Sequence, residues 1–191
     1  AFRNSGNLTI ENGVINARGI MNISGSLTIK NNVVINAIDA GGGSCINVKG
    51  GEVLIEGGEF NVTNGDQDVE GRYYEPAALT ITGGKVTILG GKFNATTTAQ
   101  YAIKVDKITD GDPSSAELII ENIEVNAWRG ALSTSKGTTV VNGGTFNTVG
   151  NSGYALYAGG GNVTINGGTF THASSVIYNY GTLWINGGTF T

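Results

Sequence analysis

Aromatic and charged side chains in the middle of the chain are the residues best suited to bind a ligand. Aromatic rings can lie against the C–H face of a pyranose, while guanidinium and carboxylate groups bond to its hydroxyls or to uronate carboxylates. The candidate ligand-binding residues are Tyr73, Tyr74, Tyr101, Trp128, Arg72, Arg129 and Glu75. They predict a site for a polysaccharide or a cell-surface glycan. The alternative is that these rings hold a long loop, residues 63–76, against the rest of the fold.

Three acidic residues of the same loop, Asp66, Asp68 and Glu70, are the candidate metal ligands. Their alternate spacing resembles the beginning of a Ca²⁺-binding loop, in which several oxygens converge on one cation. No acidic residue stands at the twelfth position of that loop, which is Ala77. Calcium is therefore one candidate and a solvated acidic loop the other, and no further cofactor is expected.

A six-residue unit positions these loops, and it is clearest as Ile185-Asn186-Gly187-Gly188-Thr189-Phe190. It recurs, with substitutions, to give eight copies that begin at residues 10, 29, 55, 88, 120, 141, 165 and 185. Successive copies are 19 to 33 residues apart. A period near 20 residues that is lengthened by insertions is typical of a solenoid, in which each repeat forms one coil.

Each repeat is expected to contain short strands. A strand such as Leu183–Ile185 precedes a Gly-rich corner, a second strand is centred on the Phe or Val that follows, and a third comes after a variable loop, as in Ile177–Tyr178. β-branched residues and alternation favour strands, and glycine supplies the positive φ that a tight corner needs. The sequence predicts one all-β domain over residues 1–191, a parallel β-helix of about eight coils with three short strands per coil.

Three side-chain columns follow from this alignment. Asparagine follows the second-strand aromatic or aliphatic residue in six repeats and threonine follows it in two: Asn16, Asn36, Asn61, Asn94, Asn126, Asn147, Thr171 and Thr191. We expect a buried ladder of these side chains at a bend, where Asn tolerates left-handed backbone. Charges alternate in two other columns, made of Glu11, Lys30 and Glu56 and of Glu52, Lys85 and Glu117.

A second set of aromatic residues lies near the end of the chain, and it consists of Tyr154, Tyr157, Tyr178, Tyr180 and Trp184. It is interpreted either as another glycan platform or as a contact surface for flanking domains of a larger parent protein. The only cysteine, Cys45, aligns with alanines of other repeats, so we expect a packed small side chain. With His172 as the only histidine, neither a zinc site nor a catalytic triad is expected.

Composition excludes several classes of function. Charged residues make up 14% of the chain, the net charge is −4, and no basic stripe is present. Binding to nucleic acid or to anionic membranes is therefore not expected, because both need clustered cations. No run of 18 apolar residues is present, so membrane insertion is not expected. The last repeat has no polar cap, so we expect the chain to be a module of a larger protein.

The Gly-Gly-Thr-Phe repeats resemble those of large secreted bacterial surface proteins, and the whole chain resembles the right-handed parallel β-helices of the pectate-lyase-like superfamily. The resemblance implies an extracellular protein, secreted or on the cell surface, and a choice among functions. Our interpretation is a non-catalytic adhesin or carbohydrate-binding segment, not an enzyme, because the motifs of the enzymatic members are missing. The alternatives are a polysaccharide lyase or glycoside hydrolase that uses Asp66, Asp68, Glu70 and Glu75, and a structural stalk or spacer.

Overall fold

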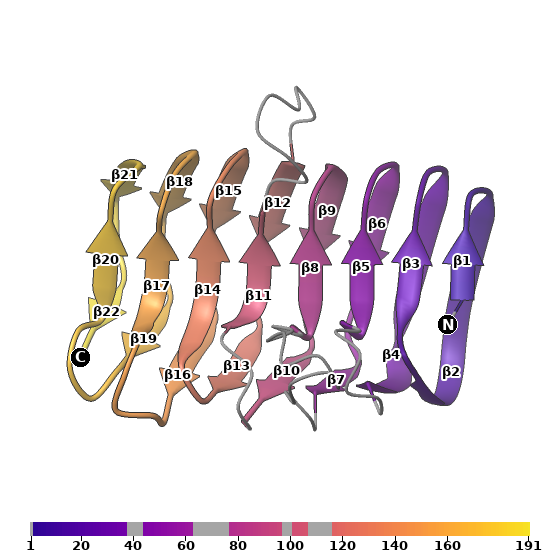
Figure 1. Cartoon of the computed structure of the whole chain (residues 1–191), viewed down its shortest axis with the longest axis horizontal. Coiled ribbons are helices and arrows are strands. Elements are labelled where there is room, and N and C mark those ends of the chain that lie inside the picture. The colour runs from indigo at the N-terminus through magenta and orange to yellow at the C-terminus, as the bar shows by residue number, and fades with distance from the viewer. Residues whose placement is uncertain (1, 38–43, 63–76, 97–100, 107–115) are drawn as a thin grey trace, which may run out of the picture.

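The computed structural model describes residues 2–37, 44–62, 77–96, 101–106 and 116–191. Within these ranges the chain forms β-strands and no helix, as the repeat predicts. Figure 1 shows the strands standing side by side in chain order from the N-terminus to the C-terminus. Every strand pair is parallel, so the protein is an all-β stack of parallel sheets that fits a β-solenoid.

One sheet of the described residues has eight strands, and its order follows the chain. Its strands are β1 (Phe2–Asn4), β3 (Ile20–Asn22), β5 (Ile46–Val48), β8 (Leu79–Ile81), β11 (Tyr101–Val105), β14 (Gly130–Thr134), β17 (Tyr154–Ala158) and β20 (Ile177–Asn179). Inward and outward side chains alternate along β3, β5 and β8, as the pleat of a strand requires, whereas β11 and β17 each have two successive buried residues after their first tyrosine. This sheet is visible across the middle of Figure 1.

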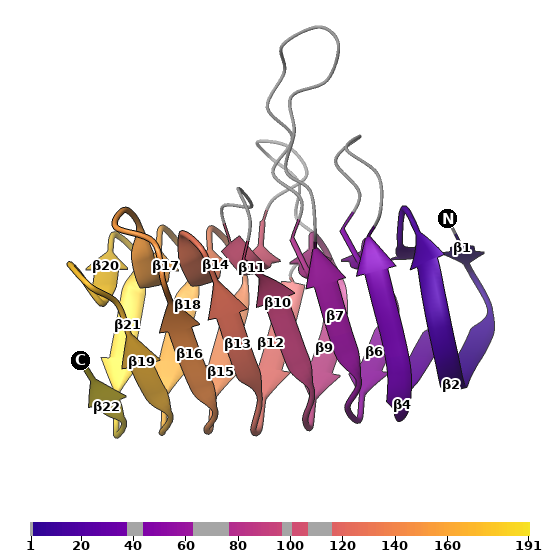
Figure 2. The same cartoon turned by 90° about the horizontal axis from the view of Figure 1, so that it is seen from below.

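The other sheet of the described part has 14 strands and two arms that meet at two long strands, β2 (Asn7–Ala17) and β4 (Ser26–Ala37). One arm contains β6 (Glu52–Ile55), β9 (Gly84–Ile88), β12 (Ala116–Ile120), β15 (Thr138–Val141), β18 (Asn162–Ile165) and β21 (Thr182–Ile185). The second arm contains β7 (Glu59–Val62), β10 (Lys92–Ala95), β13 (Glu124–Ala127), β16 (Thr145–Thr148), β19 (Thr169–Thr171) and β22 (Thr189–Phe190). Figure 2 shows the second arm in front of the first.

The pairing register confirms the alignment of the six-residue units. Ile29 pairs with Ile55, Ile55 with Ile88, and Ile165 with Ile185, so equivalent residues lie one strand spacing apart. A Gly-Gly corner follows the anchors at residues 55, 88, 141, 165 and 185, and Gly144 in one of these corners has a φ of +112°. A side chain at this φ would be strained, which explains the glycine.

Stacked aromatic rings form part of the core. Phe60, Phe93, Phe146 and Phe170 are fully buried. The ring centroids of Phe60 and Phe93 are 4.7 Å apart, and those of Phe146 and Phe170 are 4.4 Å apart. Val125 pairs with both Phe93 and Phe146 and so separates the two ring stacks. Because the stacked rings belong to adjacent repeats, the same contacts bury apolar surface and hold the two repeats in register.

The asparagine column is a ladder, but it is not buried and its backbone is not left-handed. The amides of Asn36, Asn61 and Asn94 each donate from Nδ2 to Oδ1 of the preceding asparagine, at 2.7, 2.9 and 2.8 Å. These side chains lie half-buried on the outward face of the strands. Among the described residues, positive φ occurs at glycines only. The ladder therefore satisfies polar groups of the surface and not of a buried bend.

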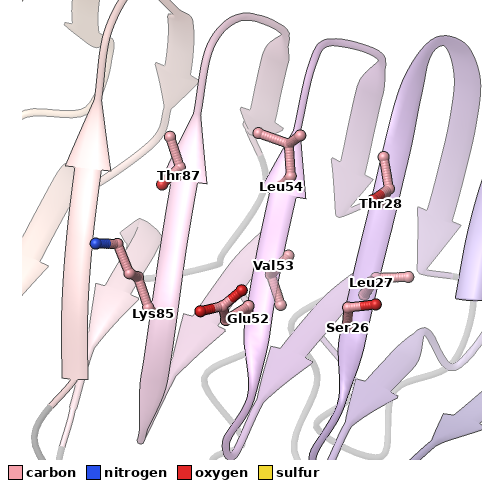
Figure 3. A pocket seen from close by; sticks show the side chains of 8 residues that line it. All are labelled: Ser26, Leu27, Thr28, Glu52, Val53, Leu54, Lys85 and Thr87. Atoms are coloured by element: carbon pink, nitrogen blue, oxygen red, sulfur yellow. The ribbon is translucent and has the colours of Figure 1, made fainter. Parts of the chain in front are cut away.

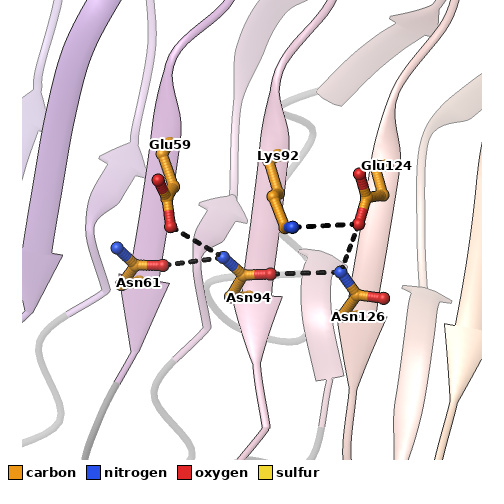
Figure 4. A network of polar contacts seen from close by, with 6 residues as sticks. All are labelled: Glu59, Asn61, Lys92, Asn94, Glu124 and Asn126. Atoms are coloured by element: carbon orange, nitrogen blue, oxygen red, sulfur yellow. Dashed lines mark hydrogen bonds and ion pairs between the residues drawn. The ribbon is translucent and has the colours of Figure 1, made fainter.

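The alternating charges form ion pairs in the predicted columns. Lys30 Nζ lies 2.6 Å from Glu56 Oε1, and Lys85 Nζ lies 3.2 Å from Glu117 Oε1. Figure 4 shows a column that the sequence analysis missed, in which Lys92 Nζ lies 3.1 Å from Glu124 Oε1. A hydrogen bond from Asn126 and the charge of Lys92 lower the pKa of Glu124. These exposed pairs set register more than they add stability.

Cys45 is fully buried, and it aligns with Gly19 of the preceding repeat and with Ala78 of the next, so a packed small side chain stands there as predicted. Its Sγ lies 3.3 Å from the carbonyl oxygen of Asn61, and burial raises its pKa to about 12. The thiolate is the reactive form, so the folded protein should resist thiol-specific reagents at mildly alkaline pH. We expect modification only at the rate of unfolding, measured by mass spectrometry over time with and without denaturant. Rapid modification of the folded chain would contradict this.

Candidate functional site

A trough on the outer face of the eight-stranded sheet brings several candidate residues together. It has a volume of about 440 Å³, and its lining comes from β11, β14, β17 and the residues beside them. The lining residues are Tyr101, Lys104, Asp106, Arg129, Ser133, Ser135, Gly153, Tyr154 and Tyr157. Figure 1 shows these three strands as neighbours in the C-terminal half of the sheet.

Small residues on β14 produce the trough. Gly130 pairs with Tyr101 on one side and Tyr154 on the other, and Ser133 pairs with Lys104 and Tyr157. Large side chains on β11 and β17 thus form two walls, and β14 forms the floor between them. The backbones of the two wall strands are separated by two strand spacings, about 10 Å.

Five tyrosines make a continuous group of rings along this face, which we call the tyrosine cluster: Tyr101, Tyr154, Tyr157, Tyr178 and Tyr180. The ring centroid of Tyr157 lies 6.1 Å from that of Tyr101 and 5.7 Å from that of Tyr178. Tyr180 meets Tyr178 edge to face at 79° and is 71% exposed. Tyr157 is therefore the central ring, and it faces the trough as well as the rest of the cluster.

Glycines determine where these side chains lie. A methyl group on Gly130 would overlap Cδ1 and Cε1 of Tyr101, so that ring lies across the glycine toward Tyr157. A methyl group on Gly153 would overlap the carbonyl oxygen of Arg129 and would lie 2.7 Å from its Cγ. Such distances are shorter than any real contact, so a side chain at either position would displace its neighbour.

The hydroxyl groups of Tyr178 and Tyr180 are hydrogen bonded, with Tyr178 donating at 2.6 Å. This bond, and then partial desolvation, raises the pKa of Tyr178 from 10.0 to about 12. The pKa of Tyr178 is higher in the folded chain than in the unfolded chain. The hydrogen bond therefore stabilises the fold fully below pH 10, and this contribution is lost as the pH rises toward 12.

In Tyr180→Phe the hydroxyl of Tyr178 loses its acceptor, so we expect its pKa to fall toward 10. Tyrosinate absorbance recorded against pH should show the last ionisation step moving to lower pH. Tyr101→Phe is the control, because Tyr101 is not among the causes of the raised pKa: it should remove one titrating group and leave that last step in place. A last step at the same pH in Tyr180→Phe would contradict the role of this bond.

The structure describes three of the seven candidate ligand-binding residues. Tyr101 and Arg129 lie in the trough, whereas Trp128 is 47% exposed and does not line it. The other candidates, Arg72, Tyr73, Tyr74 and Glu75, lie outside the described residues, and so do the candidate metal ligands Asp66, Asp68 and Glu70. Within the described ranges, no three His, Cys, Asp or Glu side chains gather as metal ligands would.

One residue of the first aromatic set joins the second set. Tyr101 of the first set is in ring contact with Tyr157 of the second, through which it joins Tyr154, Tyr178 and Tyr180. Trp184 does not share their sheet, because it lies in β21 and pairs with Thr164 of β18. No helix in the described part of the chain has the length and apolarity needed to cross a membrane.

Sequence reasoning missed Lys104, Asp106, Ser133 and Ser135 as lining residues. The sequence contained part of the signal for a trough, because Lys104, Ser133 and Tyr157 occupy equivalent places in their strands. A column that reads large, small, large across consecutive parallel strands indicates a trough. Lys104 Nζ lies 3.9 Å from Asp106 Oδ2, and the side chain of Lys104 is only 15% exposed.

A second hollow lies on the outer face of β4, β6 and β9 and has a volume of about 360 Å³ (Figure 3). It is lined by Ser26, Leu27, Thr28, Glu52, Val53, Leu54, Lys85 and Thr87. It contains no aromatic ring, and Lys85 is already paired with Glu117. The trough is therefore the better candidate for a binding site.

Comparisons of the chain with protein-family models, with curated proteins and with solved structures give no match.

Proposed function

We propose that this chain is a non-catalytic module of a secreted or cell-surface protein, an adhesin or carbohydrate-binding segment, and that it binds a glycan in the trough. The observation that carries the proposal is the arrangement of tyrosine rings on both walls of a floor of small residues. Rings take the C–H faces of sugars, and tyrosine hydroxyls, Lys104 and Ser133 offer hydrogen bonds to sugar hydroxyls. Concave sites with a few convergent polar groups are where ligands bind.

The fold that we propose is a right-handed parallel β-helix of about eight coils, with three short strands per coil, like those of the pectate-lyase-like superfamily. The in-register parallel sheets and the repeated six-residue unit support it. A rigid stack of this kind holds side chains of neighbouring coils at fixed spacing, which suits recognition of a regular polymer.

The chemistry of the trough favours binding over cleavage. Acid–base cleavage of a glycosidic bond needs two carboxyl groups roughly 5 to 9.5 Å apart. Among the described lining residues, Asp106 is the carboxylate present, and it lies beside Lys104. A lyase or hydrolase would have to draw its acids from Asp66, Asp68, Glu70 and Glu75, which lie outside the described residues.

The test is to incubate the chain with plant, host and bacterial polysaccharides, with and without Ca²⁺, and to record both retention and polymer length. We expect retention without shortening. Shortening of any polymer would overturn the non-catalytic assignment, and a requirement for Ca²⁺ would support a metal site in the loop. If no polymer retains the chain, the carbohydrate-binding proposal is wrong and the stalk alternative takes its place.

A further inference from the structure

The trough carries its charges unevenly along its length. Arg129 immediately precedes β14, whereas Ser135, at the other end, lies beside Asp106, because the Ser135 amide donates to the Val105 carbonyl at 2.7 Å. At about 3.3 Å per residue, Arg129 and Ser135 are roughly 20 Å apart along the backbone. A ligand that lies along β14 therefore meets the exposed cation of Arg129 at one end and the Lys104–Asp106 pair at the other.

Of the two cations that line the trough, one has a carboxylate beside it. Lys104 is the one that lies near Asp106. Arg129 is exposed and makes no ion pair within the described ranges, and its Cγ is held over Gly153. The guanidinium thus presents an uncompensated positive charge at a defined place, in a geometry that suits bidentate bonding to a carboxylate or sulfate.

The remaining charges disfavour a ligand with an anion on every unit. The chain has a net charge of −4, and at the other end of the trough the cation Lys104 lies beside Asp106. A second anion there would meet this ion pair and gain little, in contrast to an anion at Arg129. Resting on the function proposed above, we infer that the ligand is a largely neutral glycan chain with a single anionic group, a carboxylate or a sulfate ester, bound at the Arg129 end of the trough.

The test uses immobilised oligomers of glucose, galactose, mannose and xylose. Each neutral oligomer is compared with the same oligomer ending in one glucuronic acid, with the same oligomer ending in one sulfate ester, and with a polyuronate. For the oligomer that binds, we expect one singly charged form to bind about tenfold more tightly than the neutral form at low ionic strength. That preference should shrink as salt is added, because exposed charges are screened.

Two charge variants separate this inference from general electrostatics. Arg129→Gln should bind the charged and neutral forms of the oligomer with equal affinity. Arg3→Gln removes the same charge from β1 of the same sheet, far from the trough, and should keep the preference. Which of the two charged forms is preferred identifies the anionic group.

The outcomes distinguish this inference from the proposed function. Equal binding of neutral and singly charged forms by the wild-type chain would overturn the inference and leave glycan binding in place. Tightest binding of the polyuronate, or a preference that survives in Arg129→Gln, would also overturn it. Absence of binding to every oligomer and to the polyuronate would contradict the proposed function itself.

Discussion

Tyr157→Ala is expected to weaken glycan binding about 30-fold, which corresponds to roughly 2 kcal/mol. Tyr157 is the central ring of the tyrosine cluster, in contact with Tyr101, Tyr154 and Tyr178. Its removal takes away a stacking surface and also the support of the neighbouring rings. Residues at the centre of a binding surface, packed among other rings, carry the largest share of binding energy.

The measurement is isothermal titration of the retained glycan into wild-type and variant chains, with thermal unfolding recorded for both. Tyr157 faces outward, so its loss should leave the buried core intact and the unfolding temperature nearly unchanged. Met21→Ala is the matched control, because Met21 occupies the same outward column on β3. Wild-type affinity in Tyr157→Ala would remove the trough as the binding site.

Phe146→Ala should lower the free energy of unfolding by about 3 to 5 kcal/mol. Phe146 is fully buried, and its ring is stacked on Phe170 at 4.4 Å with an interplanar angle of 3°. Truncation leaves a cavity that the parallel strands on either side cannot fill, because their register is fixed by hydrogen bonds. The effect should spread to neighbouring repeats, since each repeat is stabilised mainly by its neighbours.

Denaturant unfolding followed by circular dichroism measures this loss. Phe2→Ala provides the comparison, because Phe2 is 48% exposed and its truncation should cost far less. A loss below about 1 kcal/mol for Phe146→Ala would mean that the ring stack is dispensable.

The repeat in the sequence was sufficient to predict which residues share a column. The anchors from Ile29 to Ile185 pair as aligned, because parallel in-register strands place equivalent residues next to each other. Burial of the asparagines was predicted wrongly, although alternation contained the answer. Side chains of successive strand residues point to opposite faces, so Asn147 had to face outward once Phe146 faced the core.

The site was harder to predict for a different reason. Columns can be read from the sequence, but the direction in which a side chain leans within its column cannot. Tyr101 reaches Tyr157 because Gly130 leaves room for its ring, and this depends on a rotamer and on a neighbour in another strand. The sequence analysis therefore treated Tyr101 and Tyr157 as members of separate sites.

The asparagine ladder gives the stack a direction. Along the second strands the amides of Asn36, Asn61, Asn94 and Asn126 donate to the asparagine of the preceding repeat. Asn166 and Asn186 do the same at the corner, each at 2.8 Å. The side-chain dipoles therefore add along the stack, and each bond polarises the next. Duplication of one whole repeat within the run from Asn16 to Asn126 would extend this array with donors and acceptors already matched, so a longer stack need not contain an unpaired amide.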